Sequence, residues 1–487
     1  MRTRRAATMA LAAMLLSAPA VRAEILDPPK YHKQDLAVYS GTISNKGGEE
    51  QVAFRETIQI KGAAWLQLRI GAAHLGERSH ITLRSLLDGA VQRHNAATLK
   101  EWGLQSAVFN GDAVELTLYT AVGDTGVFVD VTQAIVGEFF GNDDLKTIKT
   151  LCGSDSRVAS TDARVGRLFF YGCTAWITAN ASFITAGHCC DFDPDDSGPM
   201  VPDGVADISG VVEFNIPQST PSGTPVAAAP EDQYPITGAY TAWQFPGEGV
   251  GPLGDDWCVF AVGANANTGL MPALAQNAFF RLSRATPADG ATIRITGCGR
   301  DNTPPGTTGN RNSNHGTLQT ATGPYQGEGS SGSAWWHSYQ TDTEPANSGS
   351  PVIRESNNLA IGVHTNGGCQ SDGSGANSGT SFERDEFEQF VNDFPSVNTI
   401  YVDIGHPEPS NLVGSMFFPT NNVTSGVTLV PANGVLSVVR GTYSDVITIT
   451  KAMLVQAPVG TVAIGVTPGP NSIEEGPSPE PAMPPQD

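Results

Sequence analysis

Two stretches of the chain decide its fold: Cys173-Thr-Ala-Trp-Ile-Thr-Ala-Asn-Ala-Ser-Phe-Ile-Thr-Ala-Gly-His188-Cys189 and, far downstream, Asn347-Ser348-Gly349-Ser350-Pro351-Val352. The first is a largely apolar run that ends on a histidine, and the second surrounds a serine with small residues. A serine hydroxyl is a poor nucleophile at neutral pH, so acyl transfer by serine needs an imidazole to take its proton and a carboxylate to orient that imidazole. The two stretches therefore predict His188 as a base and Ser348 as a nucleophile.

Together these stretches resemble the two signature strands of the chymotrypsin-like serine proteases. In that family the triad runs His, Asp, Ser along the chain, whereas subtilisin-like and α/β-hydrolase enzymes use other orders. The missing carboxylate is expected in the stretch Gly-Asp-Asp-Trp-Cys-Val-Phe-Ala-Val at 254–262, where it would precede an apolar strand. The resemblance implies Asp256 in this role, with Asp255 as the alternative. It covers residues 151–396, about half of the chain.

The distance between the histidine and the aspartate, from position 188 to position 256, is long for that family. Residues 191–232 supply the extra length, since this stretch is rich in Asp, Pro, Gly and Ser and has no sustained periodicity. Such a composition predicts a surface insertion. We expect it to leave the site undisturbed.

The resemblance also implies that the backbone N–H groups of Ala346 and Ser348 would stabilise the oxyanion of acyl transfer. Family members nearly always have Gly at the first of these positions, and Ala there is strained if the loop needs a positive φ. Asn347 stands where trypsin-like zymogens have an Asp that binds a newly freed N-terminal amine. A neutral amide cannot form that ion pair, so activation by the trypsin route is not expected. The site is similar to the V8 or glutamyl endopeptidase branch, where Asn-Ser-Gly-Ser-Pro is common.

Substrate preference is predicted from the primary pocket of that branch, where a His and a Thr bind a glutamate side chain. The matching residues are His364, in Gly-Val-His-Thr-Asn-Gly-Gly, and Thr343. Imidazole and hydroxyl donors can hold a carboxylate at the substrate's P1 position by charge-assisted hydrogen bonds. Asp342 leaves a second interpretation open, because trypsin-like enzymes place there the Asp that selects Arg or Lys.

Composition and the N-terminus indicate a secreted, multidomain β protein. The 487 residues suggest about three units, only 16% of residues are charged, and Gly (54) and Pro (33) are abundant. Residues 1–23 read as a signal peptide, with Arg2, Arg4 and Arg5, an apolar stretch over 6–16 and a small-x-small cleavage site ending at Ala23. A net charge of −21 argues against nucleic acid as a partner. No apolar run is long enough to span a membrane.

Export to an oxidising space favours disulfides. The resemblance implies a Cys173–Cys189 bridge that clips the histidine loop to its strand. The other five cysteines cannot be paired from sequence, and their odd number leaves one thiol free or intermolecular. They are Cys152, Cys190, Cys258, Cys298 and Cys369. Their spacing is not that of a zinc site, and neither a metal nor an organic cofactor is implied.

The flanking regions carry no catalytic motif. Residues 24–150 contain runs with the period of two typical of half-buried strands, over 65–70, 106–109 and 114–119, which predicts a β-sandwich. It would be a module for a carbohydrate or cell-surface ligand, a propeptide removed on maturation, or a spacer. Residues 397–467 resemble the first turns of a right-handed β-helix, and residues 468–487 read as a Pro-rich disordered tail. Within the protease-like region, a capping box over 380–383 predicts the start of its closing helix.

The predicted fold class is thus all-β, with a two-barrel chymotrypsin-like domain between a β-sandwich and a short β-helix-like segment. The predicted function is a secreted serine endopeptidase acting on proteins or peptides. Two alternatives remain. The chain could be a catalytically weak or inactive homologue serving as an extracellular binding or adhesion scaffold. It could also be an esterase with the same acyl chemistry, although Ser348 lies outside a Gly-x-Ser-x-Gly elbow.

Overall fold

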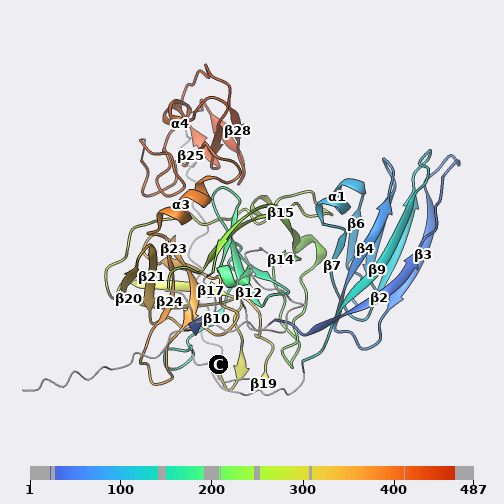
Figure 1. The fold of residues 1–487 in the computed structure, drawn as a ribbon, viewed down its shortest axis with the longest axis horizontal. Coiled ribbons are helices and arrows are strands. Elements are labelled where there is room, and N and C mark those ends of the chain that lie inside the picture. Colours follow the sequence, from blue (N-terminus) through green and yellow to red (C-terminus); the bar gives the residue numbers. More distant parts are fainter. Residues whose placement is uncertain are drawn as a thin grey trace, which may run out of the picture.

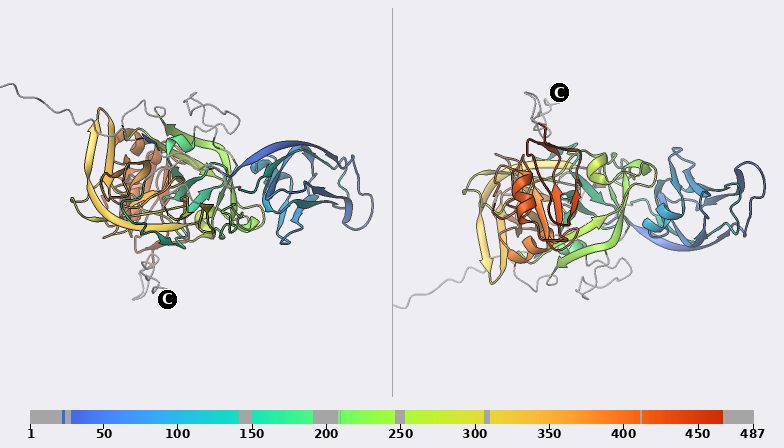
Figure 2. Two further views of the ribbon diagram at one scale, coloured as in Figure 1. Left: turned by 90° about the horizontal axis from the view of Figure 1, so that it is seen from below. Right: turned by 90° about the horizontal axis from the view of Figure 1, so that it is seen from above.

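The computed structural model describes residues 22–23, 28–140, 150–190, 208, 210–245, 253–305, 310–410 and 412–466. Three units follow one another along the chain, with the N-terminal unit on one side of a central body and the C-terminal unit on another (Figure 1 and Figure 2). Residues 191–207 of the insertion predicted over 191–232, residues 1–21 of the predicted signal peptide and the predicted Pro-rich tail lie outside the described residues. Within the described part of the chain, no helix is long and apolar enough to cross a membrane.

The N-terminal unit consists of two four-stranded antiparallel sheets whose inner faces contribute to one hydrophobic cluster. The three alternating runs noted in the sequence form β4, β7 and β8, and apolar residues of β8 such as Leu116 and Leu118 are fully buried. One sheet has the order β2-β9-β4-β7, with β2 (Tyr31–Tyr39), β9 (Phe128–Gly137), β4 (Trp65–His74) and β7 (Gln105–Asn110). The other has the order β3-β8-β5-β6, with β3 (Gln51–Gln59), β8 (Ala113–Thr120), β5 (His80–Ser85) and β6 (Val91–His94), followed by helix α1 (Ala96–Glu101).

The first half of the central body is a closed barrel of six strands in the order β11-β12-β13-β16-β15-β14. Its strands are β11 (Val165–Leu168), β12 (Cys173–Ile177), β13 (Phe183–Thr185), β14 (Val211–Glu213), β15 (Gln233–Gln244) and β16 (Trp257–Val262), with short helices η1 (Gly187–Cys189) and η2 (Pro230–Asp232). The prediction of a surface insertion over 191–232 was wrong for β14, which pairs with β11 and β15 and closes the barrel. A three-residue strand is too short to show a period, so the sequence pattern missed it.

The second half is a barrel in which β23 also pairs with β24 and so closes the ring β23-β22-β17-β20-β21-β24. Its strands are β17 (Thr292–Gly297), β20 (Gln319–Ser331), β21 (Ala334–Tyr339), β22 (Pro351–Arg354), β23 (Leu359–Gly367) and β24 (Asn377–Ser381). Shorter elements are β1 (Arg22–Ala23) on β23, β10 (Val158–Ala159) on β20, the pair β18 (Asn302–Thr303) and β19 (Asn310–Arg311), and helix α2 (Pro272–Ala275). The predicted all-β, two-barrel architecture is confirmed.

The closing helix of the central body, α3 (Asp385–Asn392), begins later than the capping box predicted. Residues 380 and 381 instead end β24, and the residue that precedes the helix, Arg384, makes no side-chain cap. The helix buries Phe387 and Val391, and Phe387 stacks on Phe382 at 4.5 Å. The Ser/Thr-x-x-Glu pattern does not start the helix, because its first two residues, 380 and 381, pair within the barrel as the end of β24.

The C-terminal unit pairs its strands in parallel. Strands β25 (Thr399–Val402), β26 (Val435–Val438) and β28 (Leu454–Gln456) form one sheet, and β27 (Gly441–Tyr443) with β29 (Val462–Ile464) forms another, beside helix α4 (Val423–Leu429). Parallel stacking of successive short strands is the arrangement of a β-helix coil. The unit is tied to the central body by Arg281, whose guanidinium donates to Asp403 at 2.6 and 3.0 Å.

Candidate active site

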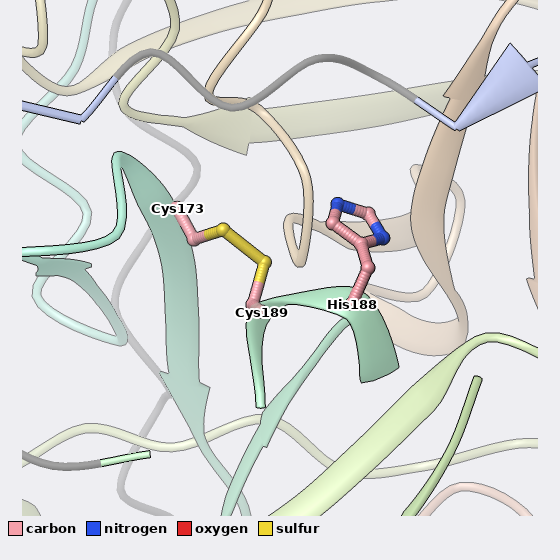
Figure 3. Close-up of side chains that lie close together, drawn as sticks. All are labelled: Cys173, His188 and Cys189. Atoms are coloured by element: carbon pink, nitrogen blue, oxygen red, sulfur yellow. A yellow bond between two sulfur atoms is a disulfide. The ribbon is translucent and has the colours of Figure 1, made fainter. Parts of the chain in front are cut away.

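His188 is held in place by the short helix η1, which follows β13 directly. Gly187 is required at the start of this helix, because a Cβ there would lie 2.0 Å from the carbonyl oxygen of Gln244. The Cys173–Cys189 disulfide implied by the resemblance is present in the structure and joins η1 to β12 (Figure 3). The imidazole is fully buried. A rigid strand, a short helix and a covalent clip thus fix the position of the ring.

Asp256 lies just before β16 and contacts His188 twice. One carboxylate oxygen lies 2.7 Å from Nδ1 of the imidazole, and the other accepts a hydrogen bond from the His188 backbone N–H at 2.9 Å. The alternative residue, Asp255, instead pairs with the buried guanidinium of Arg384. The backbone carbonyl of Asp256 accepts from the Thr380 hydroxyl at 2.7 Å, which links the two barrels at this point. The geometry therefore brings Asp256, and not Asp255, to the imidazole.

Ser348 comes from the second barrel and lies against the strands that carry His188. Its carbonyl oxygen accepts from the backbone N–H of Thr174 at 2.8 Å. The next residue, Gly349, has φ +89°, and a Cβ there would lie 2.1 Å from the Thr174 carbonyl oxygen, 2.2 Å from the Thr185 hydroxyl and 3.2 Å from the Ala186 nitrogen. Only glycine permits this approach. The serine loop is thereby pressed onto β12 and β13, directly beside helix η1.

The side chains of Ser348 and His188 are both buried. Within the described part of the chain, neither the Ser348 hydroxyl oxygen nor Nε2 of His188 has a hydrogen-bond partner. Catalytic hydrogen bonds are often long in ligand-free structures and tighten when substrate binds. The arrangement leaves Nε2 free to take a proton, while Nδ1 faces the carboxylate that fixes the tautomer.

The loop before Ser348 needs a positive φ at Ala346, the conformation in which the sequence predicts that Ala is strained. Ala346 has φ +80°, which lies in the left-handed region that favours glycine. The side-chain amide of Asn347 donates to the Glu344 carbonyl at 3.1 Å and packs against Gly297 and Gly299, where any added Cβ would meet it at 2.6 and 2.2 Å. Asn347 therefore helps to anchor the loop to the end of β17.

The predicted pocket residues Thr343 and His364 are both fully buried. Nδ1 of His364 lies 2.7 Å from the Tyr339 hydroxyl, and the Thr343 hydroxyl accepts from the Asn377 amide at 3.0 Å. Sequence reasoning missed Asn377, whose Oδ1 also accepts from the N–H groups of Gly368 and Cys369 at 2.9 and 3.0 Å. One amide thus connects Thr343 to the segment that follows β23. No motif in the sequence signals it, because its partners lie far apart along the chain.

Asp342 is the residue that left open a preference for Arg or Lys at P1. Its carboxylate is hydrogen-bonded to another segment of the chain. Its carboxylate accepts from the backbone N–H groups of Cys152 and Ser156 at 2.6 and 2.7 Å and from the Ser156 hydroxyl at 2.5 Å. The Cys152–Cys369 disulfide closes the same region covalently. A carboxylate that satisfies three donors in this way serves to anchor the start of the central body.

The remaining cysteines are also placed. Cys190 pairs with Cys258, which ties the end of η1 to β16, and Cys298 is the free, buried thiol. Burial raises the pKa of Cys298 to about 12, so its thiol stays protonated. Cys173, His188 and Cys189 lie close enough together to suggest a metal site, but the two sulfurs form the disulfide of Figure 3 and offer no thiolate. This cluster is therefore not suited to bind a metal.

No family model and no curated protein matches the sequence. Solved structures similar to this chain include a Glu endopeptidase, with 20% identity over 50% of this chain and 97% of that one and a TM-score of 0.34. A thermostable serine protease AL20 from an extremophilic microorganism matches with 15% identity over 43% and 84%, with a TM-score of 0.31. The protease Anisep from Arthrobacter nicotinovorans matches with 15% identity over 46% and 93%, also at 0.31. The two closed six-stranded barrels define the chymotrypsin-like fold class.

Proposed function

We propose that the protein is a secreted serine endopeptidase that cleaves peptide bonds through an acyl-enzyme intermediate. The observation that carries this proposal is the double contact of Asp256 with His188, next to a serine loop that glycine alone allows to approach. Ser348 attacks the peptide carbonyl while Nε2 of His188 takes its proton and later delivers it to the leaving amine. Asp256 holds the tautomer and stabilises the imidazolium. Three disulfides are consistent with an oxidising, extracellular location.

For the substrate, we propose an acidic P1 residue recognised by His364 and Thr343. The support is chemical: both side chains are buried near the serine loop, since the His364 carbonyl accepts from the Gly349 N–H at 2.8 Å. A basic P1 residue is less well supported, because the charge of Asp342 is already engaged by the segment 152–156.

The activity is tested with a peptide-library cleavage profile of the secreted protein and its Ser348→Ala variant. We expect cleavage in the wild type and a loss of at least about a thousandfold in the variant. Ser350→Ala is the matched control, since it removes a hydroxyl from the same loop two residues away and should keep activity. Equal cleavage by wild type and Ser348→Ala would refute the proposal.

The P1 preference is tested with matched substrates that carry Glu, Gln or Arg at P1. In wild type we expect Glu to be cleaved fastest, and we expect Thr343→Val to lower kcat/KM for Glu by about tenfold while changing the Gln substrate much less. Fastest cleavage after Arg would instead show that the acidic assignment is wrong.

The alternative of an inactive scaffold draws on one observation, the positive φ of Ala346. If that strain displaced the N–H of Ala346, the oxyanion would lose a donor, at a cost of about 10²–10³ in kcat. An active-site titration with a fluorophosphonate separates the two readings: stoichiometric labelling of Ser348 indicates an enzyme, and no labelling indicates a scaffold.

A further inference from the structure

The short strand β1 pairs with an edge of β23 in the second barrel. The serine loop lies along the same edge. Arg22 pairs with Gly367 and Ala23 with Asn366, in antiparallel orientation. These partners are the last two residues of β23. The pairing joins the start of the sequence to a strand that lies more than three hundred positions downstream.

The edge of β23 that β1 uses can be identified from the other pairings. Val363 pairs with β22 on one edge and with β24 on the other, and Asn366 pairs with Ser378 of β24. A strand has only two edges, so β1 must lie on the same edge as β22. Between β22 and β1, that edge is occupied by the serine loop.

The serine loop contacts this edge at His364. The Gly349 N–H donates to the His364 carbonyl, and the His364 N–H donates to the Ser350 carbonyl, both at 2.8 Å. Along one edge of β23 the order is therefore β22, the serine loop and β1. Since β1 is antiparallel, its chain runs from Gly367 towards Asn366, and so towards the loop that carries Ser348.

An open strand edge is a binding site for an extended peptide, because its unpaired N–H and C=O groups need partners. A peptide paired at Asn366–Gly367 would be aimed at Ser348, as an endopeptidase requires. We propose that β1 is an inhibitory strand in cis, which occupies the substrate-binding edge of β23 until the chain is cut after it. This inference rests on the proposed function.

The predicted signal-peptide cleavage supplies that cut. Hydrolysis of the peptide bond that follows Ala23 adds one water molecule, leaves a carboxylate on Ala23 and separates β1 from the rest of the chain. Without its covalent tie, a two-residue strand loses the high effective concentration that keeps it paired. Export and opening of the substrate edge are thereby coupled, and the uncut chain stays inactive in the cell that makes it.

The test uses the full chain made by membrane-free, cell-free translation under oxidising conditions, so that no signal peptidase acts. Wild type is compared with the Arg22→Pro/Ala23→Pro double variant, since proline lacks the backbone N–H that strand pairing uses. Arg22→Ala is the matched control, because it changes a side chain and keeps both backbone N–H groups. The readouts are kcat/KM for an extended peptide, fluorophosphonate labelling of Ser348, and hydrogen exchange over residues 365–368.

We expect the double-proline variant to cleave the extended peptide at least about tenfold faster than wild type, mainly through a lower KM. The same variant should exchange its amides over 365–368 faster, and Arg22→Ala should match wild type in both readouts. Equal rates and equal exchange in an active chain would overturn the inhibitory strand and leave the proposed function standing. Absence of cleavage and of labelling in all forms would refute the proposed function and the inhibition with it.

Discussion

At the scale of single residues, the adjacent aspartates Asp255 and Asp256 have the same chemistry but different partners. Asp256 faces the imidazole of His188, whereas Asp255 faces the guanidinium of Arg384. Both aspartates precede β16, which begins at Trp257, so their partners decide their roles and not a position within the strand. Their exchange for asparagine should therefore have separable effects.

We predict that Asp256→Asn lowers kcat by about four orders of magnitude and leaves folding intact, because an amide favours the wrong imidazole tautomer. Asp255→Asn should retain activity within about tenfold and lower stability by about 3 kcal/mol, because it leaves the buried Arg384 charge with fewer partners. Steady-state kinetics and chemical denaturation of both variants decide the matter. Loss of activity in Asp255→Asn alone would reverse the assignment.

Ala346 is a second residue whose role is set by backbone conformation. Ala346→Gly should raise stability by about 0.5–1 kcal/mol, because the strain at φ +80° exceeds the entropy cost of glycine. Ala181→Gly is a matched control at φ +65° in a turn away from the site, and it should stabilise to a similar extent without changing kcat. A lower free energy of unfolding in Ala346→Gly, measured by denaturant titration, would contradict the strain argument.

At the scale of secondary-structure elements, the end of β6 buries a histidine in surroundings that disfavour its charged form. His94 is fully buried against Trp102 at a ring distance of 5.5 Å, with Nδ1 3.3 Å from the Thr98 hydroxyl. This desolvation lowers the pKa of His94 to about 4, from an ordinary value of 6.5. The N-terminal unit therefore holds a neutral imidazole whose protonation opposes folding.

We predict a loss of stability in acid that depends on His94. The unfolded chain binds the proton near pH 6.5 and the folded chain only near pH 4, so stability falls as the pH drops through this window. The full effect below pH 4 is about 3 kcal/mol. His94→Gln should make the pH dependence of the free energy of unfolding between pH 6.5 and 4 shallower, and the remaining slope includes other histidines such as His406, whose pKa burial also lowers. An unchanged slope in His94→Gln would contradict the prediction.

At the scale of the whole molecule, the N-terminal unit and the first barrel share one hydrophobic cluster. Trp65 packs edge-to-face on Phe169 at 5.0 Å and on Phe170 at 5.7 Å. The side-chain amide of Gln233 in β15 makes two hydrogen bonds with the main chain of Val108 in β7. It accepts from the Val108 N–H and donates to the Val108 carbonyl, both at 2.8 Å. Contacts of this kind join the two units into one folding body.

We expect the N-terminal unit and the first barrel to unfold together, and Gln233→Leu to uncouple them. This change leaves the buried N–H and C=O groups of Val108 without their partners, which should cost about 2–4 kcal/mol and split a single denaturation transition into two. Gln326→Leu, at an exposed glutamine of β20, should keep a single transition. Two transitions in the wild type, followed by tryptophan fluorescence and circular dichroism, would show that the units fold independently.

The sequence by itself determined the all-β class and, through the family resemblance, the two barrels, and it singled out His188 and Ser348 as the candidate site residues. These features depend on local chemistry: an apolar strand before the histidine, glycines where the serine loop makes its close approach, and alternation in strands long enough to show a period. The implied Cys173–Cys189 bridge is found for the same reason, since both cysteines flank the strands that carry the motif.

Only the tertiary structure decided which aspartate reaches the imidazole, how the remaining cysteines pair and which residues hold Thr343 and His364. Asp255 and Asp256 differ only in the partners that a distant helix and loop supply, and Asn377 contacts three separate segments, at Thr150, at 341–343 and at Gly368. Strand β14 and the true start of α3 were likewise set by barrel closure. Such features depend on which segments meet in space, and a local pattern contains no information about its distant neighbours.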